Sequence, residues 1–165
     1  MKLYGEYTLF PGTKKQLVIP NFMTDQGNQA FLKMIARDDQ GLVAGGGNWY
    51  IGLCGNAAQG ITATLSSITD EVSETNNYSR QAVPRSLAGW PTDEKVNTVY
   101  RIITQEITFS ASGGDFDKSF TRLFLTNVST GTAGLLFSFS RPLNVPFLLT
   151  SGQSFPTTYT LYAGQ

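Results

Sequence analysis

Residues 48 to 54 read NWYIGLC, a run in which apolar side chains stand at every second position. Trp49, Ile51 and Leu53 alternate with a tyrosine, a glycine and a cysteine. This is the period of a β-strand with one buried face, whereas a helix would need apolar positions three and four residues apart. The stretch therefore predicts the first strand of a β domain, with Trp49, Ile51 and Leu53 on its core face.

Three glycines at 45–47 precede this run and raise the alternative of a nucleotide-binding loop. Gly47 and Gly52 have the G-x-x-x-x-G spacing of such a loop. The loop also needs a following Lys to reach phosphate oxygens and a Ser or Thr to hold Mg²⁺. Leu53 and Cys54 occupy those positions, so the sequence argues against phosphate binding. The glycines at 45–47 instead predict a joint before the strand, and Gly52 predicts a close approach by another backbone or side chain.

The two-residue period continues through most of the chain after residue 54. The segment at 60–70 is polar and small, and predicts a surface loop with a single helical turn. The strand spacing lies near the ~8 to 12 residues typical of a sandwich or barrel. We therefore predict a mainly β fold, an antiparallel β-sandwich of the jelly-roll type, with one short helix near the N-terminus. Further strands are expected at 78–83, 99–109, 120–128, 135–139, 145–149 and 155–162.

The N-terminal part has a different pattern. Residues 2–9 alternate like a strand, and a short extended run at 16–19 ends at a proline. A helix is expected at 25–37, because Phe31 begins an apolar i, i+3, i+4 pattern and Thr24 is placed to cap the first turn. The predicted organisation is an N-terminal strand or arm with the helix in residues 1–44 and a β-sandwich domain in residues 45–165.

Composition excludes several functional classes. The chain has 165 residues, 12 basic and 12 acidic side chains, no histidine and one cysteine, Cys54. Without histidine, Ser-His-Asp, Cys-His and His-metal chemistry are absent. The zero net charge favours neither nucleic acid nor an anionic membrane. No signal peptide or membrane span is expected. We therefore predict a protein that is not an enzyme and has no cofactor, no metal, no catalytic residue and no cofactor-binding residue.

Charged residues make up only 15% of the chain, which favours a homo-oligomer or another permanent assembly.

Two constellations of polar residues have structural interpretations. The acidic pairs, such as Asp115 and Asp117, lie in polar segments and predict solvated turns, and the calcium-loop pattern lacks its later glycine and closing glutamate. Arg80 and Arg85 lie among aromatic residues that include Trp90. With acidic residues on both sides, this segment predicts arginine stacking on aromatic rings at a strand end or a subunit contact, rather than a nucleic-acid groove.

The order of three short motifs resembles a known family. These motifs are an N-x-x-T-x-x-G helix start at 21–27, YIGL at 50–53 and Y-x-R-x-A-V at 78–83. The chain resembles small virion proteins of tailed bacteriophages, of the head-decoration and tail-fibre-like kind, over roughly residues 20 to 163. The resemblance implies a structural protein without catalytic residues, located in the virion after synthesis in the host cytoplasm, whose partners are other capsid or tail subunits.

Three functions follow as hypotheses. The first is a capsid decoration or cement protein that binds neighbouring capsid subunits. The second is a tail, baseplate or fibre-attachment component. The third, from another class, is a carbohydrate-binding β-sandwich in which Trp49, Trp90 or the C-terminal tyrosines stack on sugars. The place of Trp49 on the expected core face argues against the third.

The first strand supplies the candidate interface residues. If residues 2–9 form an arm that adds a strand to a neighbour's sheet, Tyr4, Tyr7 and Phe10 are its expected anchors, because aromatic residues dominate interface energies. The alternative is an ordinary edge strand of the same domain.

Overall fold

The computed structural model describes residues 2–37, 47–55 and 60–164, and it is mainly β with antiparallel strands. Within these ranges one α-helix, α1, spans Asp25–Arg37, and a 3-10 turn spans Leu65–Ser67. The strands are β1 (Lys2–Leu9), β2 (Leu17–Met23), β3 (Asn48–Cys54), β4 (Gln81–Pro84), β5 (Thr92–Val96), β6 (Val99–Ile103), β7 (Ile107–Ser110), β8 (Arg122–Thr126), β9 (Leu136–Ser140) and β10 (Ser154–Gly164).

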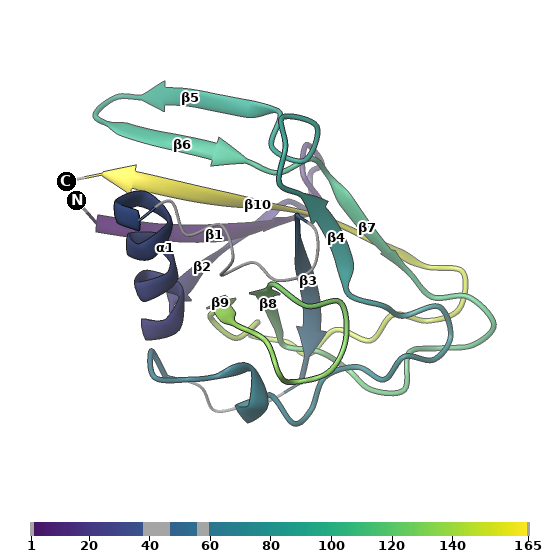
Figure 1. Cartoon of the computed structure of the whole chain (residues 1–165). Helices are drawn as coiled ribbons and strands as arrows, with labels where there is room; N and C mark the ends of the chain where they lie inside the picture. Colours follow the sequence, from purple (N-terminus) through teal and green to yellow (C-terminus); the bar gives the residue numbers. More distant parts are fainter. Residues whose placement is uncertain (1, 38–46, 56–59, 165) are drawn as a thin grey trace.

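The strands form one curled sheet. Their order is β4-β3-β8-β9-β2-β1-β10-β6-β5, and β7 pairs with the first half of β10. The sheet curls so that β6 and β10 cross the direction of β3 and β4 (Figure 1). Because the hydrogen-bonded ladder is continuous, the expected jelly-roll sandwich of two sheets is not confirmed, whereas the mainly antiparallel β class is.

β1 lies inside this sheet. It pairs with β10 from Lys2↔Gly164 to Leu9↔Thr157 and with β2 on its other side. The first strand is therefore integrated between two strands of its own chain, and the two chain ends lie side by side (Figure 1). The expected boundary between residues 44 and 45 falls in 38–46, outside the described residues. β1 and β2 nevertheless share the ladder of the later strands.

Three predicted strands differ most from the observed ones, and one observed strand was not predicted. The expected 99–109 strand is divided between β6 and β7, because Thr104 turns to bond with Tyr159 through both its N–H (2.9 Å) and its Oγ1 (2.9 Å). β2 continues through Pro20, which lacks an N–H but accepts a hydrogen bond from the Arg141 N–H (2.8 Å). The segment at 145–149 forms a single bridge to Phe120. β5 was not expected, because TDEKV lacks an apolar alternation.

β3 has a core on each side. Trp49, Ile51 and Leu53 belong to the principal core, which confirms the predicted core face. Cys54, on the opposite face, packs in a second cluster with Phe124. The segment 60–70, expected as a surface loop, has the predicted helical turn but also covers this second face. Its buried residues are Ala63, Leu65 and Ile68.

The helix has the predicted bounds, but it follows β1 and β2 in the chain rather than lying near the N-terminus. Thr24 caps it, because its Oγ1 accepts a hydrogen bond from the Gly27 N–H (3.0 Å). The same hydroxyl donates to the Leu136 carbonyl on β9. A Cβ at Gly27 would lie 2.1 Å from the Phe137 carbonyl oxygen, so glycine lets the helix approach β9 closely. Among the helices of the described ranges, none has the length and apolarity to cross a membrane.

Candidate binding groove

The three predicted interface residues have different environments. Tyr4 is 37% exposed and stacks on Tyr162, with ring centroids 4.9 Å apart. Tyr7 is fully buried against Tyr159. Phe10 packs edge-on against the Phe155 ring, with centroids 5.3 Å apart. Of the three, Tyr4 offers the most surface to a partner, whereas Tyr7 is a core residue of this chain.

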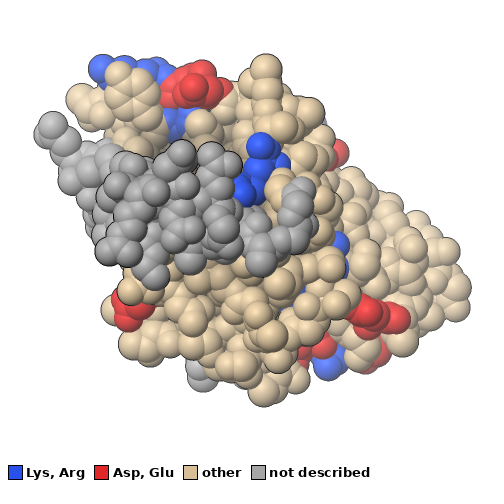
Figure 2. All heavy atoms as spheres, in the orientation of Figure 1, with Lys and Arg blue, Asp and Glu red and all other residues tan. Residues whose placement is uncertain are grey.

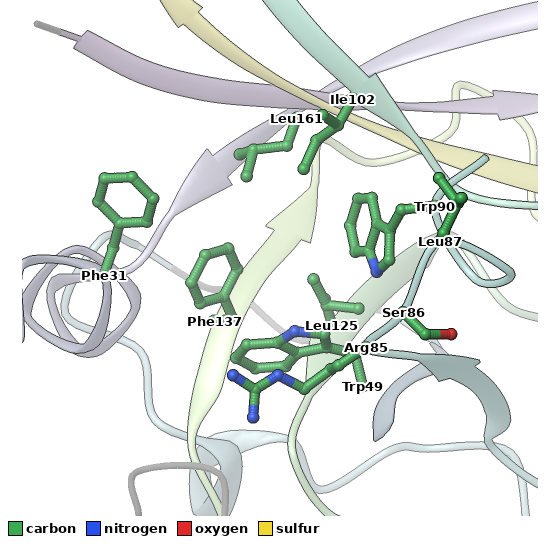
Figure 3. A pocket seen from close by; sticks show the side chains of 10 residues that line it. All are labelled: Phe31, Trp49, Arg85, Ser86, Leu87, Trp90, Ile102, Leu125, Phe137 and Leu161. Carbon is green, nitrogen blue, oxygen red and sulfur yellow. The ribbon is translucent and has the colours of Figure 1, made fainter. Parts of the chain in front are cut away.

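The curl of the sheet leaves an apolar groove of about 440 Å³. Strands from both ends of the sheet form its walls: β3, β8 and β9 on one side, β6 and β10 on the other. Helix α1 contributes Phe31 at one end, and the turn before β5 lies at the other end (Figure 3). The lining residues are Phe31, Trp49, Arg85, Ser86, Leu87, Trp90, Ile102, Leu125, Phe137 and Leu161.

The floor of the groove is an aromatic pair. The rings of Trp49 and Phe137 lie 4.9 Å apart at 51°, and both side chains are almost fully buried. The guanidinium carbon of Arg85 lies 6.0 Å from the Trp49 ring centre. Arg80 likewise lies over the Phe124 ring, at 5.2 Å. The predicted stacking of both arginines on aromatic rings is therefore confirmed.

A tight turn at residues 85–90 shapes the rim. The Ser86 carbonyl accepts hydrogen bonds from the N–H groups of Gly89 and Trp90, both at 3.0 Å. A Cβ at Gly89 would lie 1.9 Å from the Pro84 carbonyl oxygen, so the turn requires glycine there. The turn exposes 80% of Leu87 and directs Trp90 into the groove (Figure 3). Leu87 and the apolar groove that it lines form one contiguous apolar surface, which is a feature of contact surfaces.

A buried ion pair between Arg80 and Glu71 fixes the segment that precedes β4. Arg80, which is 6% exposed, donates to both carboxylate oxygens of Glu71 at 2.8 and 2.7 Å. It also donates to the carbonyls of Val128 (3.0 Å) and Gly131 (2.8 Å). The hydroxyl of Tyr78 donates to the same carboxylate at 3.0 Å. This network ties together three segments that have no regular secondary structure.

The other polar residues singled out in the sequence have structural contacts. Asp117 accepts hydrogen bonds from the Ser73 N–H (2.9 Å) and hydroxyl (2.6 Å), and Asp115 accepts one from the Ser151 N–H (2.8 Å). Burial raises the pKa of the Cys54 thiol to about 12, so the thiol stays protonated near neutral pH. The described part of the chain contains no group of three acidic or cysteine side chains placed to bind a metal.

No protein-family model matches the chain, and no similar curated protein was found. The groove therefore has to be interpreted from its own chemistry. Its walls are hydrocarbon and aromatic, and Arg85 brings a positive charge to its edge. Such a surface suits an apolar or aromatic side chain of another protein.

Sequence patterns indicated only part of the groove. Trp49 was expected on a core face and Trp90 beside the arginines, but Leu87, Ile102 and Leu161 were not expected to meet them. The signal that was available is SLAGW at 86–90, where a leucine and a tryptophan flank a glycine in a polar context. The meeting of β6 and β10 with β3 depends on the curl of the sheet, which no local pattern encodes.

Proposed function

We propose that this chain is a non-enzymatic bacteriophage virion structural protein, a capsid decoration or cement protein that binds neighbouring capsid subunits. One observation carries the proposal: the curled sheet forms an apolar groove lined by aromatic residues, and Leu87 at the rim of this groove is 80% exposed. An apolar surface of this kind on a protein with few charges suits burial by a neighbour. The order of the motifs at 21–27, 50–53 and 78–83 supports the virion class.

The surface chemistry supports assembly rather than recognition of a charged ligand. Most of the described surface on the face in Figure 2 carries neither acidic nor basic side chains. Charged side chains of both signs gather over the β5–β6 hairpin and again at the lower right of the view (Figure 2). The 165 residues include no histidine to serve as a general base near neutral pH. The proposed partner is therefore a neighbouring subunit that inserts an apolar side chain into the groove.

The copy number of the chain in virions tests the proposal. Quantitative mass spectrometry of gradient-purified virions should find this chain in numbers comparable with the major capsid protein. A much lower number would favour the tail or baseplate alternative, and absence from the virion would refute the proposal.

The groove is tested with a matched pair of variants. Leu87→Glu places a charge at the groove rim and should abolish binding to particles that lack the chain. Val145→Glu is the control, since Val145 is 74% exposed but does not line the groove. Both variants should unfold at the wild-type urea concentration, because both side chains face solvent. Equal particle binding by the two variants would exclude the groove as the contact.

The glycan-binding alternative receives less support. Trp49 is 7% exposed and packed against Phe137, so its ring face is not a free platform for a sugar. Trp90 lies edge-on to Tyr159 and lines an apolar wall. Sugar sites need hydrogen-bonding groups around the stacking ring, and this groove is mainly hydrocarbon.

A further inference from the structure

The β5 strand leaves one edge of the sheet open. β5 is the last strand on its side of the ladder, and it pairs with β6 alone among the described strands. All its residues except Thr92 are exposed. At the other end of the sheet, β4 has four residues and ends in Pro84, which cannot donate to a ladder. β5 is therefore the edge better suited to pair with another strand.

The hairpin register determines which backbone groups face outward. β5 and β6 are joined by a two-residue turn at 97–98, with Val96 opposite Val99. Such a turn is closed by a hydrogen-bonded pair, and hydrogen-bonded pairs recur at every second position. The N–H of Thr104, an even-numbered residue, points to the Tyr159 carbonyl on β10 (2.9 Å). Because backbone groups alternate in direction along a strand, the N–H and C=O groups of the odd-numbered residues of β6 therefore point to β5. Asp93 and Lys95 consequently direct their N–H and C=O groups to the free edge.

We propose that two copies of this chain associate by antiparallel pairing of their β5 edges around a two-fold axis at Glu94. Residue i of one copy then lies opposite residue 188 − i of the other. Asp93 and Lys95 of the two copies form hydrogen-bonded pairs, and Glu94 forms the non-hydrogen-bonded pair on the axis. The two sheets join into one sheet across the axis. This inference does not depend on the proposed virion function.

Charge complementarity selects this register. Because only odd positions have outward hydrogen-bonding groups, two-fold axes at Asp93, Glu94 or Lys95 are the arrangements that pair more than one residue of β5 with the β5 of the other copy. An axis at Asp93 places Asp93 opposite itself, and one at Lys95 places two lysines opposite each other. The axis at Glu94 places Asp93 opposite Lys95 of the other copy, twice. Opposite charges across a strand pair stabilise it, and like charges destabilise it.

The charges already present around β5 fit this arrangement. Glu94, which meets its own copy at the axis, is neutralised by Arg101, whose Nε donates to its carboxylate at 2.8 Å. Lys95 lies over the Tyr100 ring at 5.2 Å, on the side chain face that it shares with Asp93. Asp93 has no ion-pair partner within the described residues. Charges on an edge strand usually prevent pairing, but here they block two registers and favour the third.

Charge reversal tests the proposal by sedimentation at chain concentrations up to about 1 mM, which reaches weak association. The wild-type chain should form a concentration-dependent dimer. Asp93→Lys and Lys95→Asp should each weaken dimer formation at least about tenfold, because each variant opposes like charges twice. An equal mixture of the two variants should form a heterodimer, since both pairs between positions 93 and 95 are then of opposite sign. The double variant should dimerise like the wild type.

Three results would overturn the proposal: a wild-type chain that stays monomeric, single variants that dimerise as well as the wild type, or a mixture that does not associate. Misfolding does not confuse the test, because the mixture requires both variants to be folded and active in pairing. Circular dichroism of each variant alone provides the fold control.

A cysteine scan tests the register independently. Cα atoms of a non-hydrogen-bonded antiparallel pair lie about 4.5 Å apart, within the range of a disulfide. Glu94→Cys should therefore form a disulfide-linked dimer under mild oxidation. Asp93→Cys is the matched control and should not, because its opposite residue is Lys95. The native Cys54 is 1% exposed and should not react. Faster cross-linking of Asp93→Cys would contradict the assigned axis.

Discussion

Replacing Arg80 by methionine should cost far more stability than replacing Arg101, although both arginines pair with a glutamate. Arg80→Met keeps most of the side-chain volume and removes the guanidinium. The Arg80 side chain is 3% exposed and that of Glu71 is 23% exposed, so the variant leaves a carboxylate largely shielded from water without its cation. The carbonyls of Val128 and Gly131 lose their donor as well.

The magnitude follows from burial. Removing one partner of a buried ion pair costs about 3–5 kcal/mol, because the remaining charge is not compensated. In the Arg101–Glu94 pair the side chains are 31% and 42% exposed, and an exposed pair contributes about 0–1 kcal/mol. Arg101→Met is thus a matched control for the charge and the length of the side chain.

Urea unfolding followed by tryptophan fluorescence measures the difference. With a slope of about 2 kcal/mol per molar urea, Arg80→Met should lower the midpoint by about 1.5–2.5 M and Arg101→Met by less than about 0.5 M. A double variant, Arg80→Met with Glu71→Leu, should lose less than the sum of the single variants, because no buried charge remains unpaired. Midpoints that are equal for Arg80→Met and Arg101→Met would refute the importance of burial at this site.

Three further predictions concern the second core and the helix. In Gly52→Ala, a Cβ 2.2 Å from the Phe124 ring should cost about 1–3 kcal/mol of unfolding free energy in a urea titration, and an unchanged midpoint would contradict this contact. Burial raises the pKa of Cys54 to about 12, whereas the pKa of a cysteine in an unfolded chain is about 8.5. Between about pH 8.5 and 12, the free energy of unfolding of the wild type should therefore fall by about 1.4 kcal/mol per pH unit relative to that of Cys54→Ala. No such loss should occur below about pH 8, where the thiol is protonated in both states. Thr24→Ala removes the helix cap and the bond to Leu136, so its free energy of unfolding, measured by thermal denaturation, should fall by about 0.5–2 kcal/mol. Thr24→Ser should retain most of the stability.

The elements that the sequence predicted well are those whose signal is local. The period of two in NWYIGLC placed Trp49, Ile51 and Leu53 on the core face, and the cap and apolar spacing placed α1 at Asp25–Arg37. Gly52 was expected to admit a close neighbour, and the Phe124 ring occupies that space. In each case the residue pattern that carries the signal lies within one strand or helix.

The features that the sequence did not predict depend on contacts between distant segments. The sequence of β5 is that of a charged loop. Backbone hydrogen bonds to β6 stabilise this strand rather than an apolar face, so no alternation of apolar residues marks it. The place of β1 between β2 and β10 joins the two ends of the chain, which no local pattern reports. The groove likewise requires the curl of the whole sheet to bring Trp49 close to Leu161.

The groove and the β5 edge share a structural element, so their occupation should be coupled. The β5–β6 hairpin carries the proposed two-fold edge, and its β6 strand supplies Ile102 to the groove wall. The turn that presents Leu87 and Trp90 leads directly into β5. Pairing of two β5 strands restricts the hairpin and so reduces the ordering that a partner in the groove has to impose. Because such coupling is reciprocal, a partner that fills the groove also favours the dimer. Asp93→Lys, which changes no groove residue, should therefore weaken groove binding, and Lys95→Asp added in trans should restore it.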